Sequence, residues 1–184
     1  MVLLHSDKRS LGQPAPDFQL RGVDGNDYSL SSFSDSRVLV VMFICNHCPY
    51  VVAIEDRLIE LQRDYSGKGV QLVGICANDP TDYPDDSPDN LRKRWVEKSY
   101  GFPYLVDEVQ DVARAYGAVC TPDLFVYDAN RKLAYHGRLD DNWKDPGSVK
   151  KRDLREALDA LLAGRAPGAE QTPSMGCSIK WKEG

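Results

Sequence analysis

The sequence predicts an α/β fold of three layers around a central sheet. Two apolar, largely β-branched runs, 38–44 and 70–76, have the composition of buried strands. Between them, apolar residues recur every three or four positions from 51 to 65, as in an amphipathic helix. A strand, a helix and a second strand in this order indicate two parallel strands with a right-handed crossover. Because strands and helices continue to alternate, we expect helices to flank the sheet.

Before the first buried run, the chain predicts an N-terminal arm over 1–13 and then a β-hairpin. Short strands are expected near 17–20 and 26–29, and Asp24-Gly25 marks the turn between them. The segment 31–36 is a polar connection with about one helical turn. The first helix should end at Gly67 and Gly69.

The second half of the chain continues the alternation. The acidic loop 78–90 ends at Ser87 and Pro88, which have the positions of a helix cap and a first helical residue. Its carboxylates lack the order of an EF-hand, so helix capping and solvation explain them better than calcium. The remaining expected elements are a helix to Tyr100, a strand at 102–106, a helix at 109–116, strands at 124–127 and 132–136, and a helix at 154–162.

The length of 184 residues predicts a single domain, 1–184, with a C-terminal tail at 165–184. Ile179 and Trp181 in this tail indicate that it docks on the body. The net charge of -5 argues against nucleic acid as a partner. We find no apolar run typical of a signal peptide or a membrane span, so we expect a cytoplasmic protein without a membrane partner.

Five cysteines stand at positions 45, 48, 76, 120 and 177. An odd number without an export signal does not indicate a framework of structural disulfides. In a reducing compartment, such cysteines are catalytic, metal-binding or simply buried.

Cys48 is the cysteine with the clearest chemical context. A buried strand ends just before it, and Pro49 fits the first position of the following helix, which places Cys48 at the N-cap. Unpaired backbone N–H groups and the helix dipole favour a negative charge there. We therefore expect a thiol with a lowered pKa that reacts as the thiolate.

Several motifs together resemble the thioredoxin-like superfamily, in its redoxin (AhpC/TSA) branch. The segment 12–20 (GQPAPDFQL) is similar to the N-terminal signature of these proteins, and the strand–Cys48–helix unit resembles their active-site turn. Thr121-Pro122 stands where the family has its cis-proline. The resemblance covers roughly residues 10–163. It implies a thioredoxin-like α/β/α sandwich with a central mixed sheet and an N-terminal β-hairpin extension.

The chain departs from the patterns of this family at two places. The thioredoxin Cys-x-x-Cys would put a second cysteine at position 51, where this chain has Val51. The peroxiredoxin pattern would require proline and threonine at the positions of Val41 and Cys45. A thiol thus replaces the threonine that orients a peroxide, which argues against efficient peroxidase chemistry.

The family comparison implies that the side chain of Cys45 points into the site, near Cys48. The leading hypothesis is that Cys48 attacks a disulfide and that Cys45 resolves the mixed disulfide. Alternatively, Cys45 is a small buried residue, and Cys120, close to the presumed cis-proline, is the rival resolving thiol. His47 could assist Cys48, either by lowering its pKa or by moving a proton. Alternatively, it is only a surface residue beside Cys48.

The two other cysteines are interpreted as structural. Cys76 ends a core strand and is assigned to packing. Cys177 acts only if the tail folds over the site, and the favoured interpretation is that the tail covers an apolar patch.

Three function classes follow. The first is a thiol–disulfide oxidoreductase, the second a thiol peroxidase, and the third a non-enzymatic metal-binding or redox-sensing protein. A metal site with Cys45, His47 and Cys48 within four residues would be cramped. We expect no cofactor, a disulfide-bearing protein or small thiol as substrate, an external thiol as reductant, and a monomer or homodimer.

Overall fold

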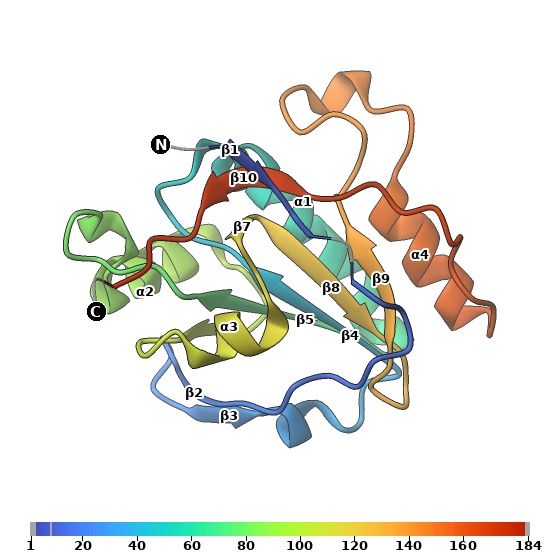
Figure 1. Cartoon of the computed structure of the whole chain (residues 1–184), viewed down its shortest axis with the longest axis horizontal. Helices are drawn as coiled ribbons and strands as arrows, with labels where there is room; N and C mark the ends of the chain where they lie inside the picture. Colours follow the sequence, from blue (N-terminus) through green and yellow to red (C-terminus); the bar gives the residue numbers. More distant parts are fainter. Residues whose placement is uncertain (1–2, 8, 183–184) are drawn as a thin grey trace.

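The computed structural model describes residues 3–7 and 9–182, and it places a seven-stranded sheet between helices (Figure 1). The sheet has the order β3-β2-β6-β5-β4-β8-β9. Its strands are β2 (Gln19–Gly22), β3 (Asp27–Ser29), β4 (Val38–Phe43), β5 (Val70–Cys76), β6 (Tyr104–Val106), β8 (Asp123–Tyr127) and β9 (Leu133–Gly137). The helices are α1 (Pro49–Tyr65), α2 (Pro88–Lys98), α3 (Asp111–Tyr116) and α4 (Asp153–Leu162). This architecture confirms the expected α/β fold.

Strand β4 is central to the sheet and leads to the candidate site. It pairs in parallel with β5 and antiparallel with β8, which makes the sheet mixed. Successive side chains of a strand point to opposite faces, and β4 supplies Val40 and Met42 to one core cluster and Val41 and Phe43 to the other. All six residues of β4 are buried because both faces are covered.

The helices divide between these two cores. The apolar side of α1, with Ile54 and Leu58, packs in the same core as Leu158 of α4. On the opposite face, α3 contributes Tyr116 to the second core. None of the helices in the described part of the chain is long and apolar enough to cross a membrane.

The boundaries of several elements differ from the predicted ones by one to two residues. Helix α2 ends at Lys98 instead of Tyr100, because Ser99 takes a left-handed conformation with φ of 52°. Helix α3 begins at Asp111, after Gln110 with φ of 66°. The predicted N-terminal hairpin is present as β2 and β3, and Gly25 with φ of 90° lies in its turn.

A second, three-stranded sheet has the order β1-β10-β7 and was not predicted. Its strands are β1 (Leu3–His5), β7 (Cys120–Thr121) and β10 (Met175–Ser178). Figure 1 shows β10 (red) between β1 and β7, close to the start of α1. This small sheet joins the two ends of the described chain to the segment before β8, and it covers the N-terminus of α1.

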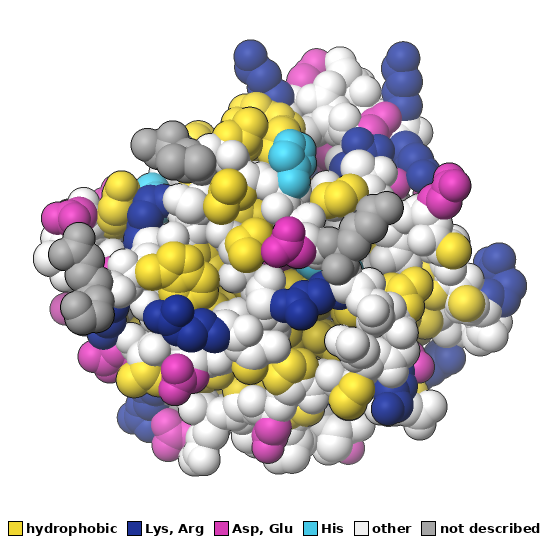
Figure 2. All heavy atoms as spheres, viewed as in Figure 1, with side chains coloured by type: hydrophobic (Ala, Val, Ile, Leu, Met, Phe, Trp, Pro, Cys, Tyr) yellow, Lys and Arg dark blue, Asp and Glu magenta, His cyan; other side chains and the backbone are white. Residues whose placement is uncertain are grey.

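The tail after β10 also binds to the body of the protein. The backbone N–H of Ile179 donates to the carbonyl of Val119, and that of Lys180 donates to Oδ1 of Asn78. The guanidinium of Arg114 lies over the ring of Trp181, 4.5 Å from its centroid. In the space-filling view, acidic and basic side chains are interspersed over this face (Figure 2).

Candidate active site

Cys48 lies at the N-cap of α1, as the sequence predicts. Strand β4 ends at Phe43, a short turn follows, and Pro49 is the first helical residue. The backbone N–H of Val51 donates to the Cys48 carbonyl. The Cys48 side chain is therefore held at the positive end of a 17-residue helix.

The Cys48 sulfur is enclosed by groups that come from distant parts of the chain. It lies 2.8 Å from Sγ of Cys177 and 3.1 Å from the carbonyl oxygen of Thr121. The exposed fraction of Cys48 is 0%. The thiol is thus buried under the small sheet that contains β7 and β10.

These surroundings lower the pKa of Cys48 to about 5. The largest cause is a hydrogen bond from the Cys45 thiol, which stabilises the thiolate. Burial acts in the opposite direction, but the Cys177 thiol and the nearby backbone N–H of Val51 add to the lowering. The thiolate is therefore the main form of Cys48 at neutral pH.

Cys45 lies beside Cys48 and is also buried. Its sulfur is 3.3 Å from Oγ1 of Thr121. Burial raises the pKa of Cys45 well above its usual value, and its hydrogen bond to Cys48 raises it further. Cys45 therefore keeps its proton while Cys48 is ionised, which makes Cys45 a hydrogen-bond donor to the thiolate.

We expect Cys45→Ala to raise the pKa of Cys48, because it removes the donor that lowers this pKa most. A titration of thiolate absorbance near 240 nm, corrected with Cys48→Ser, measures the shift. Cys45→Ser keeps a donor at this position and is the matched control, for which we expect a smaller change. An unchanged midpoint in Cys45→Ala would contradict this role.

Thr121 and Pro122 form the wall of the site opposite α1. The peptide bond between them is cis, as the resemblance implied. Thr121 contacts both thiols, through its carbonyl oxygen to Cys48 and through its hydroxyl to Cys45. The preceding residue, Cys120, instead has its sulfur 3.9 Å from Oγ of Ser6, and burial raises its pKa.

Cys177 is the site residue that sequence reasoning did not place. Burial and the hydrogen bond to Cys48 raise the pKa of Cys177 to about 12, so it stays protonated beside the thiolate. The sequence feature that could have indicated this position is Gly176, directly before Cys177. A Cβ on Gly176 would lie 1.9 Å from the Thr121 carbonyl oxygen, so only glycine permits this close approach of the tail.

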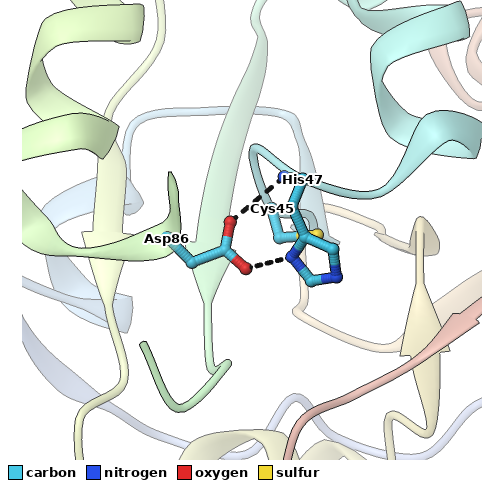
Figure 3. A group of neighbouring side chains, drawn as sticks. All are labelled: Cys45, His47 and Asp86. Atoms are coloured by element: carbon cyan, nitrogen blue, oxygen red, sulfur yellow. Dashed lines mark hydrogen bonds and ion pairs between the residues drawn. The ribbon is translucent and has the colours of Figure 1, made fainter. Parts of the chain in front are cut away.

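His47 forms a buried pair with Asp86 (Figure 3). Nδ1 of His47 lies 2.5 Å from Oδ2 of Asp86 and donates to it. The same carboxylate accepts from the backbone N–H groups of Asn46 and His47 and from the side chain of Asn78. The loop before α2 is thereby attached to the turn that carries the cysteines. Sequence reasoning assigned the acidic residues of this loop to capping and solvation and did not identify Asp86.

Cys45, His47 and Asp86 also place their potential metal-ligating atoms within 4.8 Å of one another. However, both oxygens of Asp86 already accept hydrogen bonds. Of this group, the thiol of Cys45 and Nε2 of His47 would then remain as ligands, which is fewer than the four that a structural zinc site requires. The geometry therefore favours a hydrogen-bonded His47–Asp86 pair over metal coordination.

Asp86→Ala is expected to lower the free energy of unfolding by about 3 kcal/mol, because it leaves several buried donors without an acceptor. Burial raises the pKa of Asp86, but the hydrogen bonds from His47 and Asn78 outweigh it, so folding lowers this pKa. The stabilisation is therefore present above the unfolded pKa of about 4 and is lost as the pH falls through the lower folded value.

Urea unfolding of Asp86→Ala at pH 7 measures this loss of stability. Asp85→Ala is the matched control, because the side chain of Asp85 is exposed. Equal stability of the two variants would contradict the role of Asp86.

A mostly apolar cavity of about 340 Å³ is lined by residues close in sequence to the site. Its walls include Tyr50, Pro122 and Met175. In the sequence, these lie within two positions of Cys48, Thr121 and Cys177. The ring of Trp143 closes one side, with its centroid 4.3 Å from that of Tyr50. The lining residues of the cavity do not include Cys45, Cys48 or Cys177, so the cavity offers space for apolar groups near the site without reaching the buried Cys48 sulfur.

Comparison with known proteins shows which family has this combination of fold and site. The sequence profile of the AhpC/TSA family matches residues 11–136, which is more than half of the chain. The chain belongs to the AhpC/TSA family. The matched part of this AhpC/TSA protein includes Cys45, Cys48 and the cis-proline. It ends before the tail that carries Cys177.

Similar proteins are found among solved structures and curated sequences. The AhpC/TSA protein is 47% identical to an uncharacterized conserved protein from Geobacillus kaustophilus, with a TM-score of 0.95 and coverage of 100% of this chain and 98% of that one. It is 22% identical to the thiol-disulfide oxidoreductase ResA of Geobacillus thermodenitrificans over 83% of this chain and 78% of that protein. A putative peroxiredoxin of Mycobacterium tuberculosis is 28% identical over 58% of this chain and 63% of its own length.

The family, the thioredoxin-like fold and these relatives identify a thiol-dependent oxidoreductase of the redoxin branch.

Proposed function

We propose that the protein is a thiol–disulfide oxidoreductase in which the Cys48 thiolate attacks a disulfide of a protein or small molecule. The observation that supports this most directly is the position of Cys48 at the N-cap of α1, with thiol donors that lower its pKa to about 5. The thiolate bonds to one substrate sulfur, and the other substrate sulfur leaves as a thiolate. A mixed disulfide with Cys48 results.

A second thiol of the chain then completes the exchange. It attacks the Cys48 sulfur, releases the remaining substrate thiol and leaves a disulfide within the protein. The two electrons taken up by the substrate come from these two protein thiols. An external thiol reductant then reduces the protein disulfide back to two thiols. Cys45 is the resolving thiol proposed from the sequence.

The apolar cavity near the site supports a disulfide with apolar neighbouring groups as substrate. Its walls are largely apolar, and the rings of Tyr50 and Trp143 lie on one side. Apolar side chains next to a substrate cysteine would lose water on entering it, which stabilises the complex. The odd number of cysteines supports a reducing compartment, and we propose the cytoplasm. For the oligomeric state, we propose a monomer or homodimer.

The peroxidase alternative has less support from the site. At the position where peroxidases of this family have a threonine, this chain has Cys45, whose pKa is raised. Its thiol is already engaged with Thr121 and with the Cys48 thiolate.

A paired activity assay tests the proposed function. The protein is given excess dithiothreitol with insulin or oxidised glutathione in one series, and with hydrogen peroxide in the other. We expect a larger kcat/KM for the disulfide than for the peroxide. Fast peroxide turnover without disulfide turnover would overturn the proposal in favour of a peroxidase.

A further inference from the structure

The contact between Cys48 and Cys177 is shorter than a packing contact between two side chains. Their sulfurs lie 2.8 Å apart, less than 1 Å beyond the length of an S–S bond, which is about 2.05 Å. The two residues are 129 positions apart in the sequence. The close approach is thus a product of how the C-terminal tail folds.

Strand pairing fixes the position of Cys177 at this site. In the small sheet, Cys177 of β10 is paired with Thr121 of β7 on one side and with Leu3 of β1 on the other. Gly176 permits the close contact with Thr121, because a side chain there would collide with the carbonyl oxygen that also contacts Cys48. Beyond β10, the tail is attached through Lys180 to Asn78.

We propose that Cys177 is the resolving thiol of this protein, so that its oxidised form carries a Cys48–Cys177 disulfide that joins α1 to the C-terminal strand. This inference rests on the proposed thiol–disulfide exchange at Cys48. It assigns the second half of the reaction to the tail instead of to Cys45.

The step balances without a further reactant. The Cys177 sulfur attacks the Cys48 sulfur of the mixed disulfide, the Cys48–substrate S–S bond breaks, and the Cys48–Cys177 bond forms. The proton of Cys177 passes to the departing substrate thiolate. The two protein thiols are oxidised, and the substrate disulfide is reduced to two thiols.

The electrostatics of the site give the order of these events. Burial is the largest cause of the raised pKa of Cys177, and while Cys48 is a thiolate, its hydrogen bond and its charge raise this pKa further. Once Cys48 is bonded to the substrate, that charge is gone. The part of the raised pKa of Cys177 that Cys48 causes is then removed, while the part caused by burial remains. The Cys177 sulfur is therefore a better nucleophile after the first step than before it.

Burial links this chemistry to a movement of β10. Cys48 is 0% exposed and Cys177 is 1% exposed. A substrate disulfide therefore requires the site to open, and we expect β10 to move away from α1 because Cys177 of this strand covers the Cys48 sulfur. The return of β10 carries Cys177 to the mixed disulfide. Cys45 has a different position, because it follows the central strand β4 and its sulfur contacts the Thr121 hydroxyl.

Disulfide mapping and trapping test the proposal. The reduced protein is treated with oxidised glutathione, quenched with acid, alkylated and analysed by tandem mass spectrometry. We expect a 48–177 linkage in the wild type. In Cys177→Ser, we expect glutathione to remain on Cys48, with release slowed at least tenfold. Cys45→Ser, which keeps a hydrogen-bond donor, should still form the 48–177 linkage and release glutathione.

The outcomes separate this inference from the proposed function. A 45–48 or 48–120 linkage in the wild type, or trapping in Cys45→Ser but not in Cys177→Ser, would overturn the role of Cys177 and leave the proposed function intact. If no variant forms an adduct or a disulfide at Cys48, the proposed function itself fails.

Gly176→Ala gives a second measurement that keeps all five thiols. The added Cβ pushes β10 away from Thr121. We expect slower formation of the 48–177 disulfide, with the adduct on Cys48 persisting longer. Gly168→Ala is the matched control, because a Cβ at Gly168 in the same tail meets no atom within 4 Å. Equal resolution rates in both variants would contradict the proposal.

Discussion

Replacing Cys48 by serine is expected to reduce the turnover of a disulfide substrate by roughly 10³-fold or more, as for the loss of other covalent nucleophiles. Serine keeps the size of the side chain at the N-cap of α1, but its hydroxyl does not ionise near neutral pH. It therefore provides no anion to attack sulfur. Steady-state reduction of insulin or oxidised glutathione with dithiothreitol measures the loss.

A matched control distinguishes loss of the nucleophile from loss of any cysteine. Cys76 is buried at the end of β5, where its pKa is raised by burial. We expect Cys76→Ala to keep disulfide turnover within a few-fold of the wild type in protein that remains folded. Comparable turnover by Cys48→Ser and the wild type would exclude Cys48 as the nucleophile.

The second large effect concerns pH. With its pKa at about 5 instead of 9.0, Cys48 is ionised to about 99% at pH 7 instead of about 1%, a roughly 100-fold gain in thiolate. Because the folded pKa is lowered, the thiolate is present above pH 5 and is lost as the pH falls through that value. The difference in absorbance near 240 nm between the wild type and Cys48→Ser should titrate with a midpoint near pH 5. A midpoint near pH 9 would mean that the hydrogen bonds from Cys45 and Cys177 do not stabilise the thiolate.

Much of the fold follows from local sequence patterns. The apolar runs that become β4 and β5 are continuous, and the stepped apolar residues of α1 fit one face of a helix. Pro49 limits where this helix can begin, which is why the N-cap position of Cys48 could be predicted. These features depend on neighbouring residues, and each is visible in a short stretch of sequence.

The parts of the site that were missed depend on contacts between distant segments. Strand β10 contains Gly176, Cys177 and Ser178, and neither an apolar run nor an alternating pattern marks it as a strand. This segment forms a strand because it pairs with β1 and β7. In the same way, Asp86 belongs to a loop of exposed acidic residues and differs from them only because His47 and Asn46 lie close to it in the fold.

The position of Cys45 was predicted only through the resemblance to the redoxin branch. The structure gives this thiol a definite physical role, because its hydrogen bond is the largest cause of the lowered pKa of Cys48. Its role as the resolving thiol remains a prediction from the sequence. The proximity of Cys177 to Cys48 provides the competing assignment.

The central claim is that Cys48 is the thiol that reacts with a disulfide. The most direct test is a single-turnover reaction of the reduced wild-type protein with oxidised glutathione, followed by acid quenching and peptide mapping of every new disulfide. We predict that Cys48 is present in each product formed in the first turnover, either bonded to glutathione or bonded to a second cysteine of the chain. A first product that contains another cysteine and leaves Cys48 as a thiol would contradict the claim.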